Sequence, residues 1–257
     1  MIKELEKFKS YFKNFNDSFV IIGGTACSLL YENAGSRFRS TKDIDIVVTI
    51  TELKKSEAFS KQFYKFIKDG KYSKFQKDNK IFYYRFIKPL QEDFPKLIEL
   101  FSKEQLKTDK SIENNYTSLD KDDNYHLSAI VIENDCYNLI SKNVVYINGL
   151  PVAKPLVLIF LKTIAWDDLK TIKENGEKNV ATKDIRKHRN DIIRINEILT
   201  GEDKLYINKE LYNRLIIILK RVKESFSDVD IKNIIGRKNF DKSEIFRNII
   251  FKYKIDK

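Results

Sequence analysis

The sequence has few of the residues that build disulfide-bonded or zinc-bound scaffolds. It contains two cysteines and two histidines in 257 residues. Cys27 and Cys136 lie in apolar surroundings without CxxC or CxxH spacing, and His126 and His188 are far apart in the chain. Such spacing argues against a disulfide framework and against a local zinc motif. We therefore expect two buried, unreactive thiols.

Long apolar runs are also missing. No segment approaches the roughly 18–20 apolar residues of a membrane-spanning helix. The first residues, MIKELEKFKSYFKNF, are charged and amphipathic and lack the apolar core of a signal peptide. Hydrophobic residues at 42% and charged residues at 33% are typical of a globular protein with one large or two small cores. We expect a cytoplasmic protein with no membrane partner.

The positive charge is unevenly distributed. The net charge is +11; residues 1–150 carry 24 basic and 21 acidic side chains, and residues 151–257 carry 24 and 16. The C-terminal part therefore has a net charge of +8, which is typical of a surface that binds a polyanion. A solvated lysine-rich face with no partner explains the same composition equally well.

The pattern of apolar residues divides the chain near Pro151 and Pro155. Before this point helix-like segments alternate with strand-like ones; beyond it the apolar residues recur at helical spacing. We predict an α+β fold with a small mixed sheet in a domain over 1–150 and a basic helical bundle of four or five helices over 151–257. The predicted strands cover 19–23, 43–50, 80–88, 96–101, 127–132 and 144–149, a polar loop covers 103–125, and the predicted helices cover 5–12, 25–32, 53–69, 156–172, 183–199, 208–226 and 242–254.

Two acids stand inside an otherwise apolar predicted strand. In DIDIVV, Asp43 and Asp45 alternate with Ile44 and Ile46, so the two carboxylates share one face of the strand. Adjacent carboxylates repel unless a cation lies between them, and Mg²⁺ prefers such oxygen ligands together with substrate phosphates. Two solvated acids at a strand edge are the alternative.

A third acid and a pair of glycines extend this pattern. Glu99 lies between Ile98 and Leu100 in the apolar segment KLIELF. If its strand lies beside that of the two aspartates, three carboxylates can hold divalent ions that activate an attacking oxygen and neutralise a leaving pyrophosphate. Otherwise Glu99 is a lone acid at a strand edge. Gly23 and Gly24 lie between a predicted strand and helix, where main-chain amides can bind phosphate or simply form a tight turn.

These residues together resemble a known family. GGTA at 23–26, followed by RSTKDID at 39–45, is similar to the DNA polymerase β-type nucleotidyltransferase superfamily, and most closely to the AbiEii/AbiGii toxin family of abortive-infection and toxin–antitoxin nucleotidyltransferases. The segments LKTIAWDDL at 161–169 and KDIRKHRND at 183–191 also resemble family segments. The likeness spans about residues 19–199.

The resemblance implies a Mg²⁺-dependent transfer of a nucleoside monophosphate from a nucleoside triphosphate to an acceptor hydroxyl, with release of pyrophosphate. It implies a nucleotidyltransferase-like domain over 1–150, with Asp43, Asp45 and Glu99 as metal ligands and Glu99 as an alternative general base. It also gives Asp184 a catalytic or metal-assisting role. The implied substrate-binding residues are Gly23, Gly24, Thr25, Arg39, Thr41, Lys162 and Lys187.

The helical part leaves structural alternatives open. Asp184, Lys187, His188 and Asp191 fall on one stripe of the helix predicted over 183–199. That stripe could line a nucleotide cleft or form a salt-bridged solvent face. Lys162 interrupts an apolar segment, either to bind phosphate or to extend its ammonium group to water. We expect Trp166 to lie in the core.

The acceptor follows from charge and resemblance alone. The +8 C-terminal part and the family likeness point to RNA, with the tRNA 3′ end as the specific expectation. A protein hydroxyl or a small molecule would leave the chemistry unchanged. Family members also imply a cognate antitoxin as a partner. A nucleotide-binding module without turnover and a basic RNA-binding module in which the acids are incidental are the competing interpretations.

Overall fold

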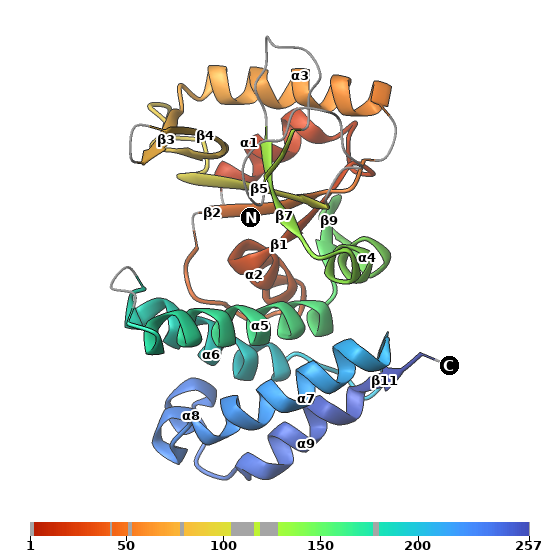
Figure 1. Ribbon diagram of the computed structural model, residues 1–257, viewed down its shortest axis with the longest axis vertical. Coiled ribbons are helices and arrows are strands. Elements are labelled where there is room, and N and C mark those ends of the chain that lie inside the picture. Colours follow the sequence, from red (N-terminus) through yellow and green to blue (C-terminus); the bar gives the residue numbers. More distant parts are fainter. Residues whose placement is uncertain are drawn as a thin grey trace. The chain divides into compact units, whose positions relative to one another are not determined.

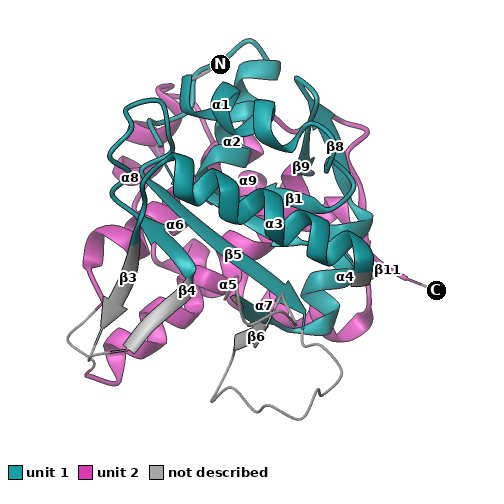
Figure 2. Ribbon diagram, turned by 90° about the horizontal axis from the view of Figure 1, so that it is seen from above, with its two compact units in different colours: residues 1–153 teal, residues 154–257 magenta. Residues whose placement is uncertain are grey.

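The computed structural model describes residues 3–41, 43–50, 53–77, 80–103, 116–118, 128–176 and 180–256. Within these residues the protein has an α+β fold and divides into two compact units, 1–153 and 154–257 (Figure 2). The division falls beside Pro155, where the sequence pattern changes. His126 and most of the expected loop over 103–125 lie outside the described residues.

The first unit is built on a mixed sheet. Its helices are α1 (Lys3–Phe12), α2 (Gly23–Asn33), α3 (Leu53–Asp69) and α4 (Asn134–Lys142). Its strands are β1 (Phe19–Ile22), β2 (Asp43–Val48), β3 (Ser73–Lys77), β4 (Lys80–Ile87), β5 (Leu97–Lys103), β6 (Tyr116–Ser118), β7 (Ser128–Ile132), β8 (Val144–Ile147) and β9 (Leu150–Ala153). The strand order is β3-β4-β5-β2-β1-β9-β8, with β7 also paired to β5 and β6 to β7. The pairs β2–β5, β5–β7 and β1–β9 are parallel and the others are antiparallel.

One face of this sheet carries an aromatic core. Phe8 and Phe12 of α1 stack with ring centroids 4.5 Å apart, and Phe12 packs against Phe63 and Phe66 of α3. The same core reaches the sheet at Phe19 of β1. Figure 1 shows α3 on one side of the sheet and α2 on the other. The side chains of β2 and β5 that point away from α1 and α3 therefore lie on the α2 side.

The second unit is mainly helical. Its helices are α5 (Pro155–Glu174), α6 (Thr182–Asn196), α7 (Lys209–Glu224), α8 (Asp228–Ile235) and α9 (Lys242–Lys252). A short parallel pair, β10 (Leu205–Ile207) and β11 (Tyr253–Ile255), joins the chain after α6 to the C-terminal segment. The hydroxyl of Tyr253 donates to the main-chain oxygen of Leu156 at 2.6 Å, which fixes this segment against α5.

The structure corrects the sequence prediction at several elements. The sheet is larger than expected, with nine strands among the described residues. The prediction gave no position for α4, α8, β3, β6 or β9, and β6 lies inside the expected loop. It also missed β10 and β11 in a region expected to be only helical. The turn between β8 and β9 has positive φ at Asn148 (53°) and Gly149 (78°), as a two-residue Asn-Gly hairpin requires.

Candidate active site

Asp43, Asp45 and Glu99 lie on one face of the sheet. Strands β2 and β5 are parallel neighbours, and their register places Asp45 beside Glu99. Ile44 and Ile46 are buried toward the opposite face, while both aspartates are half-buried. The adjacency of these two strands was only a condition in the sequence analysis; the structure meets it, although α3, β3 and β4 lie between the two strands in the chain. The alternation of acid and isoleucine separates a polar face from the core.

The start of α2 lies against the Asp45 carboxylate. Strand β1 runs antiparallel to β2, with Ile22 opposite Asp45, and the chain then turns into α2 at Gly23. Gly23 has φ +68°, and a Cβ atom built there would lie 1.9 Å from Oδ2 of Asp45. Both the positive φ and the lack of space require glycine at this position. The main chain can therefore approach the acid closely.

The second glycine brings two more predicted residues to this corner. A Cβ atom built at Gly24 would lie 2.9 Å from Oγ1 of Thr41 and 3.6 Å from Nη2 of Arg39. The Arg39 guanidinium also lies over the ring of Phe38, with 5.1 Å between the guanidinium carbon and the ring centroid. The segment before β2 thus places a hydroxyl and a guanidinium beside the first turn of α2.

The N-terminus of α2 is suited to an anion. Ile22 is its N-cap and provides no side-chain hydrogen bond, and the first turn contains no acidic residue. The first amides of a helix lack intrahelical acceptors, and they carry the positive end of the helix dipole. Thr25 is buried, and its hydroxyl donates to the main-chain oxygen of Asp43 at 2.5 Å. Thr25 therefore holds β2 against α2; its phosphate contact stays a prediction.

Arg85 is a further residue on the acid face. Strand β4 is antiparallel to β5 and places Arg85 opposite Glu99, with 3.4 Å between Nε and Oε1. The side chains are 38% and 21% exposed, so solvent screens this ion pair in part. The sequence analysis gave Arg85 no role at the site, because no local pattern shows which strand pairs with β5.

The donor set fits Mg²⁺ shared between the protein and a substrate. Across the described part of the chain, no group of three or more His, Cys, Asp or Glu side chains is arranged to hold a metal ion. Mg²⁺, however, is usually held by one or two carboxylates, with substrate phosphates and water completing its shell. Asp43 and Asp45 supply such hard oxygen donors on one strand face, and Gly23 at the start of α2 lies against Asp45.

Lys162 has a structural partner in the second unit. It is 4% exposed, and its Nζ lies 3.3 Å from Oδ2 of the fully buried Asp191. Arg194 contacts the other oxygen of the same carboxylate at 3.1 Å. A buried carboxylate between two cations accounts for the burial of Lys162. Its predicted role in phosphate binding therefore remains a prediction without support from this geometry.

The other residues predicted in the helical part lie on α6. Asp184 is in the first turn of α6, where an acid complements the helix dipole, and Lys187 lies one turn further along; both are half-buried. The stripe that contains them ends at the buried Asp191. Trp166 is 1% exposed, which confirms its expected place in the core.

No protein-family model matches this chain, and no curated protein matches it.

The two cysteines are buried thiols, as expected. Among the described residues, no helix combines the length and the apolar character that crossing a membrane requires.

Proposed function

We propose that the protein is a Mg²⁺-dependent nucleotidyltransferase. It would move a nucleoside monophosphate from a nucleoside triphosphate to the hydroxyl of an acceptor, with RNA as the acceptor class. The observation that carries the proposal is the register of Asp45 beside Glu99 on parallel strands, with Gly23 against the Asp45 carboxylate. The motif resemblance of GGTA and RSTKDID to the AbiEii/AbiGii toxin family supports the same chemistry.

Each residue of the corner has a distinct part in this reaction. The first amides of α2, at Gly23 and Gly24, bind the triphosphate oxygens, and Arg39 adds a cation beside them. Asp43 and Asp45 hold Mg²⁺, which when bound neutralises phosphate charge and orients the triphosphate. Thr41 lies close enough to Gly24 to contact a phosphate or a water.

The transfer itself is an in-line substitution at phosphorus. The acceptor hydroxyl oxygen attacks the α-phosphorus, and the bond from that phosphorus to the oxygen bridging it to the β-phosphorus breaks. Pyrophosphate leaves with the electron pair of that bond. Glu99 takes the hydroxyl proton; alternatively it would be a third metal ligand, and the proton would pass to water. Before the reaction, Arg85 pairs with the Glu99 carboxylate. The family resemblance also implies roles for Asp184 and Lys187, which stay predictions.

The biological setting follows from the resemblance. We propose the tRNA 3′ end as the specific acceptor and an antitoxin as a partner, so that the protein acts as the toxin of a toxin–antitoxin or phage-defence system. Inspecting the neighbouring reading frame tests the partner. The charge of the second unit, +8, favours a polyanionic acceptor over a protein or small-molecule hydroxyl.

The test compares labelled nucleotide incorporation into total RNA by the wild type and by the Asp43→Asn/Asp45→Asn variant. The matched control is Glu92→Gln/Asp93→Asn, which removes two charges from exposed positions of the same unit. We expect incorporation by the wild type and the control, and a loss of at least about 100-fold in the first variant, since metal-bound charge stabilisation contributes several kcal/mol. Equal incorporation by all three proteins would refute the mechanism. Binding of nucleotide or RNA without incorporation would favour the non-catalytic modules instead.

A further inference from the structure

The second unit contains a pocket of about 390 Å³ between its helices α5 and α6. Trp166 is part of its wall, and Glu174 is the one acid among its lining residues in the described chain. The lining also includes four basic side chains: Lys170, Lys173, Arg186 and Arg189. A concentration of positive charge in a concave site favours an anionic ligand.

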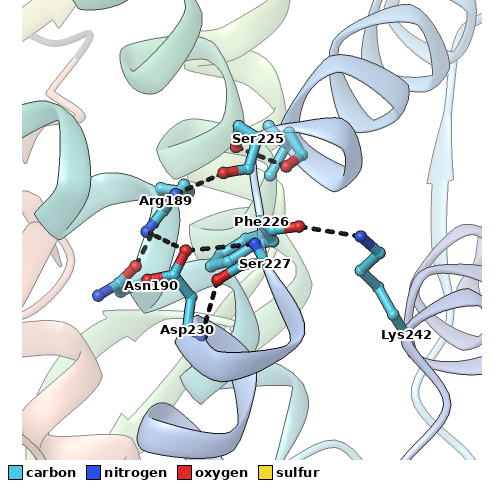
Figure 3. A network of polar contacts seen from close by, with 8 residues as sticks. Arg189, Asn190, Ser225, Phe226, Ser227, Asp230 and Lys242 are labelled. Atoms are coloured by element: carbon cyan, nitrogen blue, oxygen red, sulfur yellow. Dashed lines mark hydrogen bonds and ion pairs between the residues drawn. The ribbon is translucent and has the colours of Figure 1, made fainter.

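Arg189 is a rigid part of this wall. Its guanidinium carbon lies 4.3 Å from the ring centroid of Phe226, and its Nη1 donates to the main-chain oxygen of Ser225 at 2.6 Å. Figure 3 shows the contact with Ser225 as a dashed line. The Nη2 atom of Arg189 lies 3.4 Å from Oδ2 of Asp230, which also forms the capping box of α8 with Ser227. Burial lowers the pKa of Arg189, Asp230 opposes that shift, and the charge of Arg186 adds to it. The two guanidinium groups therefore repel each other across the pocket wall.

The remaining positive charge is only partly compensated. Lys170 pairs with Glu174 at 3.5 Å, but Glu174 also lies 3.7 Å from Arg221. Lys173 donates to the hydroxyl of Thr182, which carries no charge. Arg186 is exposed and forms no ion pair with any other described residue. The pocket thus has more cations than the neighbouring acids neutralise.

Trp166 provides an independent indication of a missing acceptor. Its side chain is 1% exposed, and its ring lies 5.1 Å from the Lys170 ammonium group. Its indole Nε1 has no hydrogen-bond partner among the described residues. Buried indole N–H groups usually donate to an acceptor. The described residues therefore leave this indole N–H without an acceptor.

We infer that this pocket is a phosphate-binding site of the helical unit and that the phosphate belongs to the polynucleotide acceptor, an inference that rests on the proposed function. The cations are arranged around a pocket whose aromatic residue is buried and cannot stack on a base. Recognition is therefore of the sugar–phosphate backbone and independent of base sequence. The net charge of +8 on this unit favours a strand over a single free phosphate.

The experiment measures binding without chemistry. A fluorescent single-stranded RNA is titrated with protein in the absence of nucleoside triphosphate, at several salt concentrations, and binding is followed by fluorescence anisotropy. The variants are Arg186→Gln and Lys170→Gln/Arg186→Gln. The control is Lys209→Gln/Lys232→Gln, which removes two exposed lysines of the same unit outside the pocket. Thermal unfolding shows whether each variant is folded. If the loss of Lys170 destabilises α5, the single variant Arg186→Gln still tests the pocket.

We expect the double pocket variant to bind RNA about tenfold more weakly than the control, with a slope of log K against log salt that is smaller by about 1.4, since each phosphate contact to a single strand contributes about 0.7. A parallel experiment compares the thermal stability of each protein in inorganic phosphate with its thermal stability in chloride. Phosphate stabilisation that is lost in the variant, with RNA binding unchanged, supports the phosphate site and assigns it to a free phosphate. Equal RNA affinity and equal phosphate response in pocket and control variants would overturn the inference. RNA binding that depends on the pocket, by a wild-type protein that incorporates no nucleotide, would support this inference and count against the proposed chemistry.

Discussion

The main chain at Gly23 and the carboxylate of Asp45 are in direct contact: a Cβ atom at residue 23 would lie 1.9 Å from Oδ2 of Asp45. The first residue of α2 and the central acid of β2 therefore depend on each other's position. An acid placed this close to a helix start can share a ligand with the helix amides. A metal-bound triphosphate is such a ligand.

Replacing Gly23 by alanine tests this contact. The φ of +68° disfavours alanine by about 1–2 kcal/mol, and the new methyl group displaces the Asp45 carboxylate. We expect a stability loss of that size and a loss of nucleotide incorporation of about 100-fold, because small misplacements of catalytic groups have effects of this order. The control is Gly201→Ala, where a Cβ atom meets no other atom within 4 Å. Full activity in Gly23→Ala would show that the contact has no role in the reaction.

The Lys162–Asp191 pair predicts a stability effect in the helical unit. Lys162→Met removes one of the two cations that contact the buried Asp191 carboxylate and leaves the contact with Arg194. We expect a loss of about 3 kcal/mol in the free energy of unfolding, measured by urea denaturation. The double variant Lys162→Met/Asp191→Asn should lose less than the sum of the single variants, because it leaves no buried charge unpaired at this contact. Additive losses would mean that the two side chains do not interact.

The Arg85–Glu99 pair predicts an effect on Mg²⁺. Arg85→Gln removes a cation 3.4 Å from the Glu99 carboxylate, and with it a competitor of any metal ion that this acid binds. The Arg85–Glu99 ion pair is partly exposed and stabilises the fold by about 1 kcal/mol or less. Its removal should therefore raise the affinity for Mg²⁺ by up to about fivefold. The measurement is the Mg²⁺ concentration that gives half-maximal thermal stabilisation with a nucleoside triphosphate present. Weaker Mg²⁺ binding in Arg85→Gln would exclude competition between Arg85 and the metal for Glu99.

Asp230 predicts a pH-dependent contribution to stability. Burial acts to raise the pKa of Asp230, but hydrogen bonds with Ser227 and the charge of Arg189 outweigh it and lower the pKa. A lowered pKa means that the folded state favours the ionised form, so the stabilisation is full well above the unfolded value near 3.9. It is lost as the pH falls below that value. The Asp230 side chain is 40% exposed, so solvent screens its interactions, and Asp230→Asn should cost at most about 1 kcal/mol at pH 7 and less at pH 3. Denaturation at both pH values measures this difference. A cost that does not change with pH would contradict this account.

Local patterns in the sequence predict much of the first unit. The alternation of Asp43 and Asp45 with Ile44 and Ile46 correctly separates a polar face from a buried one, because side chains alternate along a strand. Gly70 follows the end of α3, as expected. The Asn148-Gly149 pair predicts a β8–β9 hairpin, a signal that the sequence analysis did not use. The three-residue strand β10 is too short for a clear period, whereas α4 buries Cys136, Tyr137, Leu139 and Ile140 at helical spacing, a signal that was missed.

Contacts between distant segments could not be predicted in this way. The register of Asp45 with Glu99 joins strands separated in the chain by α3, β3 and β4, and parallel pairing leaves no local signature. The partners of Glu99 and Lys162, namely Arg85 and Asp191, depend on the same long-range packing. The sequence therefore predicted which residue types the site needs, but not which side chains neutralise them.

The most direct test of the central claim follows the two ends of the triphosphate with the wild-type protein, Mg²⁺ and RNA. Each of the four nucleoside triphosphates is supplied with a label on either the α- or the γ-phosphate. For the accepted nucleotide, we predict that the α-label enters RNA and that the γ-label appears in pyrophosphate. Transfer of the γ-label to the acceptor, or no incorporation of α-label from any of the four nucleotides, would contradict the account.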